Sequence, residues 1–204
     1  MYSIKKLSEF NRQKVQEHFL RLDPESRRSR FCATMNNENL SLYAKNLDFI
    51  HNGIFGIFND NLDIIGLGEC VSYDPKNGYS SIAEVAFSIE KPYQGKKLGN
   101  KIMQKVVQYA NLHNLKELKM YFLKTNAATF HLAKKYNFKL EYYSSEISGT
   151  IKVNSISPIA ENFNTQMDEV IANFDIIQKI QNKIVKQNLE SWNKNISKFF
   201  NNKI

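Results

Sequence analysis

The sequence predicts a mixed α/β fold (α+β): a largely antiparallel sheet with helices on both faces, followed by a helical extension at the C-terminus. Three observations support this class. Between residues 54 and 89, apolar runs of strand length alternate with clusters of turn residues. From residue 98 to residue 143, helical spacing and strand signals alternate. Beyond Pro158, only helical spacing remains.

Two helices are expected before the first strand. Helical spacing of apolar residues over 8–21 ends at the punctuation Leu22-Asp23-Pro24-Glu25. A second, short helix is expected over 37–47, where apolar residues are spaced for one face behind an Asn cap. After this helix, the spacing changes to that of strands.

Three strands follow as an antiparallel meander. They are expected over residues 54–58, 62–73 and 82–89. Asn59-Asp60-Asn61 connects the first two strands, and the turn residues 74–78 connect the second to the third. Because these connections are short, successive strands must run in opposite directions.

A helix of about fourteen residues is predicted to begin near Leu98, because an apolar stripe recurs there at helical spacing. The stripe comprises Leu98, Ile102, Met103, Val106, Val107 and Ala110. A strand over 118–123, a helix over 126–136 and a strand over 138–143 follow. A helix that connects two strands in this way implies a parallel pair and a right-handed crossover.

The C-terminal segment predicts a long helix. Apolar residues follow the spacing of a heptad seam, first as Phe163, Met167, Val170, Phe174 and Ile177, then after a shift as Val185, Leu189, Trp192, Ile196 and Phe199. No Gly or Pro occurs from Glu161 onward, so one helix of up to about 40 residues, or two with a bend near Asn182, is expected. The seam over 163–177 suggests self-association into a homo-oligomer, and docking on the chain's own domain is the alternative.

Composition narrows the class of protein. The chain has 204 residues, of which 42% are apolar, and a chain of this length buries roughly 70% of its surface, so the core needs no disulfide or metal. No apolar run approaches the roughly 18 residues of a membrane-spanning helix, and no signal peptide is evident. Cys32 and Cys70 lack the spacing of metal ligands. We therefore expect a cytoplasmic protein without a metal or a membrane partner.

The charge balance favours an anionic partner. Lys and Arg number 28 against 20 Asp and Glu, which gives a net charge of +8. Nucleic acid, an anionic membrane face and a phosphate-rich cofactor all suit that charge. The basic residues are scattered, with Arg27-Arg28-Ser29-Arg30 and Lys96-Lys97 the densest groups, so composition alone does not choose among these partners or exclude a merely solvated basic surface.

The most informative segment is the strand from Ala83 to Ile89 and the Gly-containing turn, Gln94 to Gly99, that leads from it into a helix. Such a turn directs several backbone N–H groups and a helix N-terminus at one point, which suits a phosphate group. Lys96, Lys97 and Lys101 add positive charge there. A plain helix start is the alternative interpretation.

A second segment makes the first more specific. Asn126-Ala127-Ala128-Thr129-Phe130-His131-Leu132-Ala133-Lys134-Lys135-Tyr136-Asn137-Phe138 resembles the segment Asn-x-x-(Ala/Met)-x-x-Leu-x-x-Lys-x-Gly-Phe of the GNAT superfamily of acyl-CoA-dependent N-acyltransferases. The turn Gln94 to Gly99 resembles the (Arg/Gln)-x-x-Gly-x-(Gly/Ala) signature of the same superfamily. The resemblance spans residues 1–154 and leaves 155–204 as the helical extension. Residues 18–31 also resemble the N-terminal helices of a bacterial branch that includes protein-lysine acetyltransferase domains.

The resemblance implies a site for acetyl-CoA as co-substrate, with no metal. The family's cofactor strand parts from its neighbour so that its backbone pairs with the pantetheine arm. Carried over by position, the cofactor-binding residues are Phe87, Ser88, Ile89, Gln94, Gly95, Lys96, Lys97, Leu98, Gly99 and Asn126. Lys97 departs from the usual Gly. If that position needs a positive φ, the substitution strains the turn, whereas a helical backbone would let Lys97 still offer its N–H.

Catalysis requires a base, because an amine with a pKa of about 10.4 is almost entirely protonated at pH 7. Glu84, on the cofactor strand, stands where GNAT lysine acetyltransferases often carry a glutamate; a salt-bridged structural role is the alternative. Glu69 on the preceding strand is the reserve base. Ala133 occupies the position at which many GNAT enzymes carry a tyrosine that acts as general acid. His131, Tyr136 or a water are therefore the candidates for that role.

Two further expectations concern Asn137 and three of the histidines. Asn137 replaces the family's Gly after the second motif, a mild change because Asn tolerates the left-handed conformation. His18, His51 and His113 are expected to be packed or surface residues without a role.

The expected function is transfer of an acetyl group from acetyl-CoA to a primary amine, either a protein lysine or a small molecule, by direct attack with Glu84 as base. A non-catalytic acyl-CoA-binding or regulatory module is the alternative, suggested by Ala133, Lys97 and the appended helix. A nucleic-acid binder would rest on charge alone, so no nucleic-acid partner is expected.

Overall fold

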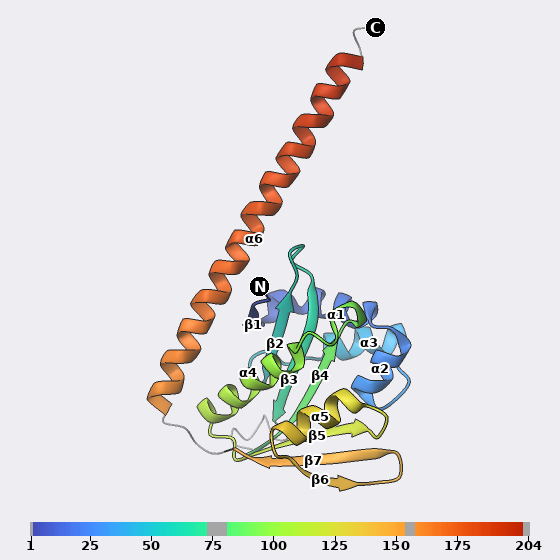
Figure 1. Ribbon diagram of the computed structural model, residues 1–204, viewed down its shortest axis with the longest axis vertical. Coiled ribbons are helices and arrows are strands. Elements are labelled where there is room, and N and C mark those ends of the chain that lie inside the picture. The colour runs from blue at the N-terminus through green and yellow to red at the C-terminus, as the bar shows by residue number, and fades with distance from the viewer. Residues whose placement is uncertain (1, 73–80, 154–157, 202–204) are drawn as a thin grey trace.

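The computed structural model describes residues 2–72, 81–153 and 158–201, and the side chains of the C-terminal helix over 170–194. Seven strands form one sheet in the order β1-β2-β3-β4-β5-β7-β6 (Figure 1). The strands are β1 (Ile4–Lys6), β2 (Gly53–Phe58), β3 (Ile64–Ser72), β4 (Ile82–Ile89), β5 (Glu117–Leu123), β6 (Lys139–Tyr142) and β7 (Glu146–Lys152). The α-helices are α1 (Arg12–Arg21), α2 (Pro24–Phe31), α3 (Asn37–Lys45), α4 (Leu98–Leu112), α5 (Ala127–Lys135) and α6 (Pro158–Asn201), and the short 3-10 helices are η1 (Glu9–Asn11) and η2 (Lys91–Tyr93).

The sheet confirms the predicted mixed, largely antiparallel class. β2, β3 and β4 form the expected antiparallel meander, and β4 and β5 form the parallel pair that the helical crossover implied. The predicted turn over 74–78 lies outside the described residues. Two strands were missed: β1 is only three residues long, and β7 is interrupted by Gly149, which blurs its alternating pattern. A Cβ at Gly149 would lie 3.1 Å from Met120, so close packing explains this glycine.

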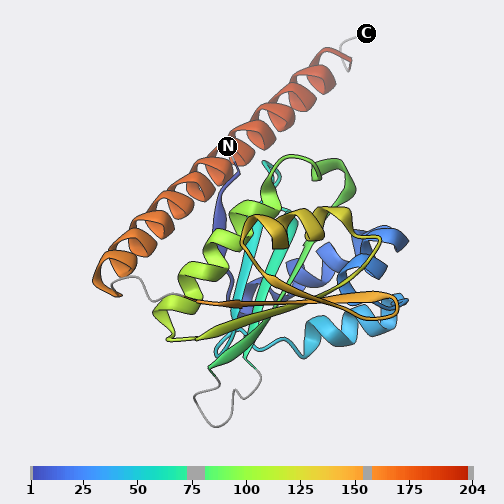
Figure 2. The ribbon, with the colours of Figure 1, turned by 60° about the horizontal axis from the view of Figure 1, so that its bottom comes forward.

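Helices cover both faces of the sheet, each over its own core (Figure 2). α1 and α3 bury Val15, Phe19 and Leu40 against one face, together with the β3 side chain Leu67. On the other face, α4 buries the predicted stripe from Leu98 to Ala110, with Val107 partly exposed. Two apolar layers therefore hold the strands between them.

The sequence pattern did not predict α2 as a helix of its own, distinct from the turn residues Leu22-Asp23-Pro24-Glu25. The Asp23 side chain accepts hydrogen bonds from the backbone N–H groups of Glu25 and Ser26 at 3.1 Å each, and Pro24 occupies the first helical turn. The Asp-Pro pair that ends α1 therefore also caps a new helix, because proline suits the first turn, where its missing N–H leaves no bond unmade.

α6 is one continuous helix with two contrasting sides. Its inner face packs on the domain through Ala172, Ile176, Lys179 and Lys183: the Lys179 Nζ donates to the Phe58 carbonyl at 3.3 Å and pairs with Asp175 at 2.7 Å. Its outer face comprises the exposed apolar side chains Val170, Ile171, Phe174, Ile177, Ile180, Ile184, Val185, Leu189 and Trp192. Beyond Lys183 the helix projects away from the domain (Figures 1 and 2). Docking and an open apolar seam therefore coexist on one helix.

The described residues contain neither a membrane-spanning helix nor a cluster of metal-binding side chains. In that part of the chain, no helix is long and apolar enough to cross a membrane. The same residues contain no group of three or more His, Cys, Asp or Glu side chains that could hold a metal ion. Cys32 and Cys70 are both free thiols.

Candidate active site

The sheet opens between its two parallel strands. β4 pairs with β3 along its whole length, from Ala83 to Ile89, but its register with β5 comprises three pairs, the last being Glu84 opposite Lys119. Beyond that pair, β5 continues alongside β7 as far as Leu123. The end of β4 therefore has a strand on one side only. A gap of this kind presents backbone groups to an extended ligand, as a missing strand would meet them.

The turn after β4 forms a concave backbone surface. Gly95 has φ +73° and Lys97 has φ +59°, and α4 begins at the next residue, Leu98. Two left-handed residues in one turn direct backbone N–H groups toward its concave side, and the N-terminus of α4 adjoins it; such an arrangement suits an anion. Nothing lies within 4 Å of a Cβ built at Gly95, so the space before the turn is open.

Lys97 occupies the position that requires a positive φ. Of the two possibilities that the sequence left open, the structure therefore shows the strained one: a lysine in the left-handed region, which costs roughly 1–2 kcal/mol. Gly99 behaves differently. It is already helical, and a Cβ there would meet Ile89 and Leu132 at 3.8 and 3.9 Å, which are ordinary contacts.

The neighbouring side chains hold the turn against β4 and α2. The Gln94 Nε2 donates to the Ile89 carbonyl at 2.9 Å and lies 3.3 Å from the Ser26 Oγ. The Lys96 Nζ lies 5.0 Å from the centroid of the Tyr93 ring. The position that the family fills with Arg or Gln therefore fixes the start of the turn to the strand end.

Asn126 caps α5 at the same edge of the sheet. Its Oδ1 accepts a hydrogen bond from the Thr129 N–H at 3.0 Å. Because β4 and β5 are parallel, the segments that follow them start at one edge, and the Lys135 Nζ joins α5 to α4 by donating to the Asn100 Oδ1 at 2.6 Å. The structure thus brings together the predicted cofactor positions on β4, in the turn and at the start of α5.

Two glutamates share the sheet face that α1, α2 and α3 cover. Val71 pairs with Glu84, and Glu69 lies two residues before Val71, so both carboxylates point to the same side. Glu69 is only 1% exposed; its Oε1 lies 2.6 Å from an Arg30 nitrogen, and its Oε2 accepts from the Tyr43 hydroxyl at 2.7 Å. Both oxygens of Glu69 are therefore occupied by protein groups.

The pKa values around Glu69 reflect this burial. Burial raises the pKa of the Tyr43 hydroxyl, and the adjacent Glu69 charge raises it further. Burial alone would lower the pKa of the Arg30 guanidinium, but Glu69 and Tyr43 keep it above its ordinary value. Arg30 and Glu69 therefore form a buried ion pair whose charges depend on each other.

Glu84 lies in a more open setting, at the last paired position before the strands part. Its side chain is partly exposed, and α2 packs over β4 and β5 beside it. The Cys32 thiol at the end of α2 lies 3.9 Å from the Tyr121 carbonyl. Burial raises the pKa of this thiol, and the nearby charges of Glu146 and Glu84 raise it further.

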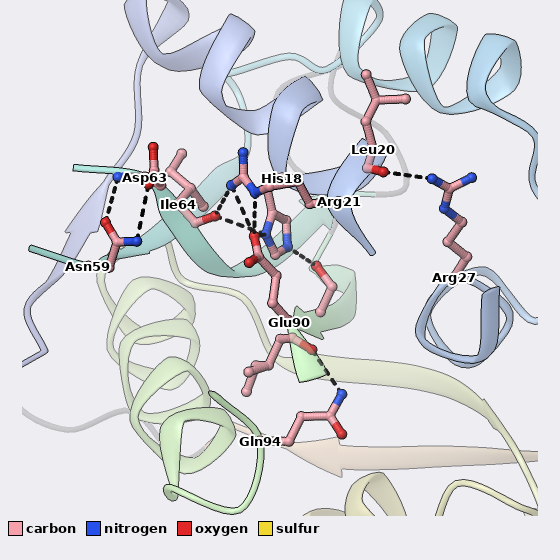
Figure 3. A network of polar contacts seen from close by, with 11 residues as sticks. His18, Leu20, Arg21, Arg27, Asn59, Asp63, Ile64, Glu90 and Gln94 are labelled. Carbon is pink, nitrogen blue, oxygen red and sulfur yellow. Dashed lines mark hydrogen bonds and ion pairs between the residues drawn. The ribbon is translucent and has the colours of Figure 1, made fainter. Parts of the chain in front are cut away.

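A polar network fixes the far end of β4, as Figure 3 shows. His18 is fully buried; its Nδ1 lies 3.1 Å from both the Ile64 carbonyl and the Glu90 carboxylate, and its Nε2 lies 2.8 Å from the Ser88 hydroxyl. Since both partners of Nδ1 are acceptors, the proton belongs on Nδ1, and Nε2 accepts from Ser88. Arg21 also pairs with Glu90 at 2.9 Å.

Burial lowers the pKa of His18, although Glu90 acts in the opposite direction, so the ring stays neutral near pH 7. As the sequence suggested, His18 is a packed residue, but its contact with Ser88 on the cofactor strand had no signal in local patterns. Histidine and serine lie 70 positions apart and meet only in the folded chain.

The second motif ends as expected. Asn137 has φ +59°, the Phe138 N–H donates to the Ala133 carbonyl at 2.9 Å, and the Asn137 N–H donates to Lys134 at 3.0 Å. This is a Schellman motif with asparagine in the glycine position. Ala133 is fully buried, His131 is exposed, and the Tyr136 hydroxyl lies 3.3 Å from the Asn100 carbonyl.

Comparison with known families identifies the type of domain that has this parted sheet and this turn. The family model described as the acetyltransferase (GNAT) domain matches residues 6–139. The chain therefore belongs to the GNAT acetyltransferase family. Among curated proteins, none matches the chain significantly by sequence.

Solved structures show the same fold at low identity. The GNAT domain of PAT from S. lividans has a TM-score of 0.62 and 12% identity, covering 73% of this chain and 89% of that one. The ribosomal-protein-S18-alanine N-acetyltransferase from Escherichia coli has a TM-score of 0.58 and 12% identity, with coverage of 77% and 97%. A putative acetyltransferase of Salmonella typhimurium, solved with its cofactor acetyl-CoA, has a TM-score of 0.59 and 12% identity, with coverage of 77% and 96%.

Proposed function

We propose that this protein transfers the acetyl group of acetyl-CoA to a primary amine, with Glu84 as the general base. One observation carries the proposal: the gap between β4 and β5 starts at Glu84, and the anion-binding turn follows the other end of the same strand. A carboxylate and a phosphate site thus stand at opposite ends of a strand edge that can pair with an extended ligand. The membership of the GNAT family supports this assignment.

The residues present suit acetyl-CoA. The N–H groups of the turn, with Gly95 and Lys97 left-handed and α4 beginning behind them, form a cradle for the pyrophosphate. The unpaired edge of β4 over Phe87 to Ile89 suits the amides of the pantetheine arm. When bound, acetyl-CoA supplies an acetyl thioester. A solved GNAT neighbour carries this cofactor, which supports the choice of co-substrate.

Glu84 removes the proton that an amine must lose. An alkylamine with a pKa of about 10.4 is neutral in only one part in 10³–10⁴ at pH 7, and only the neutral form is nucleophilic. In the overall reaction the nitrogen gains the acetyl group and loses a proton, and CoA leaves as the thiol. Glu69 is a poor candidate for the base, because Arg30 and Tyr43 already engage both of its oxygens.

We assign the acceptor to the protein-lysine class. The resemblance of residues 18–31 to the N-terminal helices of bacterial protein-lysine acetyltransferases supports this class, and the net charge of +8 disfavours polycationic small molecules. The two free cysteines are consistent with the reducing cytoplasm that we propose as its compartment.

Calorimetric titration tests the cofactor site. Acetyl-CoA and CoA are expected to bind with micromolar affinity, whereas a matched nucleotide without the pantetheine arm binds more weakly. Gly95→Ala should weaken acetyl-CoA binding at least about tenfold, because φ +73° strains any side chain there. Gly99→Ala should weaken binding less than Gly95→Ala, because its Cβ has room in the helix. Absence of binding to the unmodified chain at millimolar acetyl-CoA would refute the proposal.

A non-catalytic acyl-CoA-binding module is the second candidate, because Ala133 replaces the tyrosine that often protonates the leaving thiolate. The two candidates differ in turnover. An acetyltransferase releases CoA when acetyl-CoA and lysine-bearing peptides are both present, at a rate that Glu84 controls. Tight binding of acetyl-CoA without thiol release, across a broad panel of amines, would favour the module.

A further inference from the structure

The outer face of α6 carries nine of the fifteen large apolar side chains that are exposed in the described part of the chain. Its nine side chains are each 40–63% exposed. The middle of this face, with Val170, Phe174 and Trp192, lies about half a turn around the helix from Ala172, which faces the domain, because successive residues rotate by about 100°. Docking of α6 on its own domain therefore leaves this face uncovered.

The size of the face matches that of a stable interface. Single-domain monomers rarely expose contiguous apolar patches of more than a few hundred Å². Nine half-exposed side chains that include Phe174 and Trp192 present an area on the order of the ~800 Å² that a standard protein interface buries per partner. A second helix of similar length would cover the face along its whole extent.

The charge pattern of α6 complements a reversed copy of itself. Its first half, residues 158–180, carries four acidic residues and one lysine: Glu161, Asp168, Glu169, Asp175 and Lys179. Its second half, residues 181–201, carries four lysines and one glutamate: Lys183, Lys186, Glu190, Lys194 and Lys198. Asp175, Lys179 and Lys183 contact the domain or each other. For the remaining charges, antiparallel pairing brings the acidic half of one helix nearest the basic half of the other, and it also opposes the two helix dipoles.

One polar residue suggests the register of such a pair. Gln181 follows Ile177 by four positions and precedes Ile184 by three, so it lies within the apolar face and near the middle of the helix. A polar side chain inside an apolar seam favours the alignment in which it meets another polar group. In an antiparallel pair aligned on Gln181, Val170 of one helix lies beside Trp192 of the other.

We propose that the outer face of α6 binds the outer face of a second copy of this chain, antiparallel and centred near Gln181. The dimer is held by a two-helix seam that lies outside the two acetyltransferase domains. An anionic membrane is a poorer partner for the same face, because the acidic half of α6 would be repelled by it.

The oligomeric state of the full-length protein tests the proposal. Light scattering after gel filtration should give the mass of a dimer. Ile177→Glu combined with Ile184→Glu places charges in the seam and should weaken dimerisation at least about tenfold. Asn182→Glu, an exposed polar position between them, is the control and should leave the dimer intact. A monomeric unmodified chain, or a dimer that the double substitution does not weaken, overturns the proposal. So does a monomer that co-sediments with anionic phospholipid vesicles.

Cysteine cross-linking tests the direction of the pair in a Cys32→Ser background. Gln181→Cys should form a disulfide-linked dimer, because the two copies of this residue meet near the axis. Val170→Cys alone should not, but mixed with Trp192→Cys it should form a heterodimer. If Val170→Cys cross-links to itself as readily as Gln181→Cys, the helices are parallel and the antiparallel assignment is wrong.

Discussion

The candidate site has a sealed half and an open half that share one face or edge of the sheet. The sealed half consists of Glu69 with Arg30 and Tyr43, and of His18 with Ser88 and Glu90; these side chains are wholly or largely buried and pair with one another within the protein. The open half consists of Glu84 and the turn from Gln94 to Gly99. Glu69 and Glu84, which lie on adjacent strands and on the same face of the sheet, therefore have different surroundings. Burial distinguishes the two glutamates: Glu69 is enclosed by protein groups, whereas Glu84 is partly exposed.

Glu84→Gln gives the largest expected effect. Loss of the general base should lower kcat by about 10²–10⁴-fold. The free energy of unfolding should change by less than about 0.5 kcal/mol, because the side chain is partly exposed and the amide keeps its shape. Peptide acetylation and thermal unfolding, measured on the same preparation, check the two values. A fully active Glu84→Gln variant would assign the base elsewhere.

Glu69→Gln reverses that pattern. It leaves the Arg30 charge buried without its counter-ion, so the free energy of unfolding should fall by about 3–5 kcal/mol. Replacing both partners, with Arg30→Met and Glu69→Leu, should recover most of the loss. Urea titration measures each variant. If Glu69→Gln unfolds like the unmodified chain but loses activity, Glu69 belongs to the open half and is the base.

His18 makes stability depend on pH. In the unfolded chain histidine takes up a proton below about pH 6.5, whereas burial keeps the pKa of folded His18 lower. The unfolded state then binds more protons, so stability falls as pH falls below about 6.5, by up to about 1.4 kcal/mol per pH unit. The change should be seen in thermal unfolding between pH 7.5 and 5.5.

His18→Gln should flatten this slope, even if the variant is less stable at every pH. NMR titration of the unmodified protein provides an independent reading: the midpoint of the His18 ring signals should lie below the ordinary histidine value. If His18 titrated with the ordinary midpoint of histidine, its assignment as a buried, neutral residue would be wrong. Glu90 does not confuse the result, because hydrogen bonds from His18 and Arg21 outweigh burial and keep its pKa below the ordinary value, outside this range.

Lys97→Gly gives the smallest expected effect, in the open half. Relief of the left-handed strain should stabilise the fold by about 0.5–1 kcal/mol, after allowance for the greater chain entropy of glycine. Acetyl-CoA affinity should stay within about tenfold, because the backbone N–H groups of the turn remain in place. Lys96→Gly, at the preceding position, is the matched control and should not stabilise the fold. A gain from Lys96→Gly as large as that from Lys97→Gly would count against the strain.

The sequence by itself determined the order of the main helices and strands, the turn after β4, and the position of Glu84 on its strand. These features depend on residues close together in the chain, such as Gly95 and the α4 stripe that begins at Leu98. It also predicted that Asn137 could end α5 in the left-handed conformation, which the structure confirms.

Only the tertiary structure decided that β7 inserts between β5 and β6, that Glu69 is sealed by Arg30, and which side of α6 faces the domain. Each of these depends on partners distant in sequence: Arg30 and Glu69 are 39 positions apart, and Lys179 and Phe58 are 121 apart. Local periodicity shows that a side chain belongs to an apolar or polar face. The burial and charge of that side chain are set by whichever distant segment packs against it.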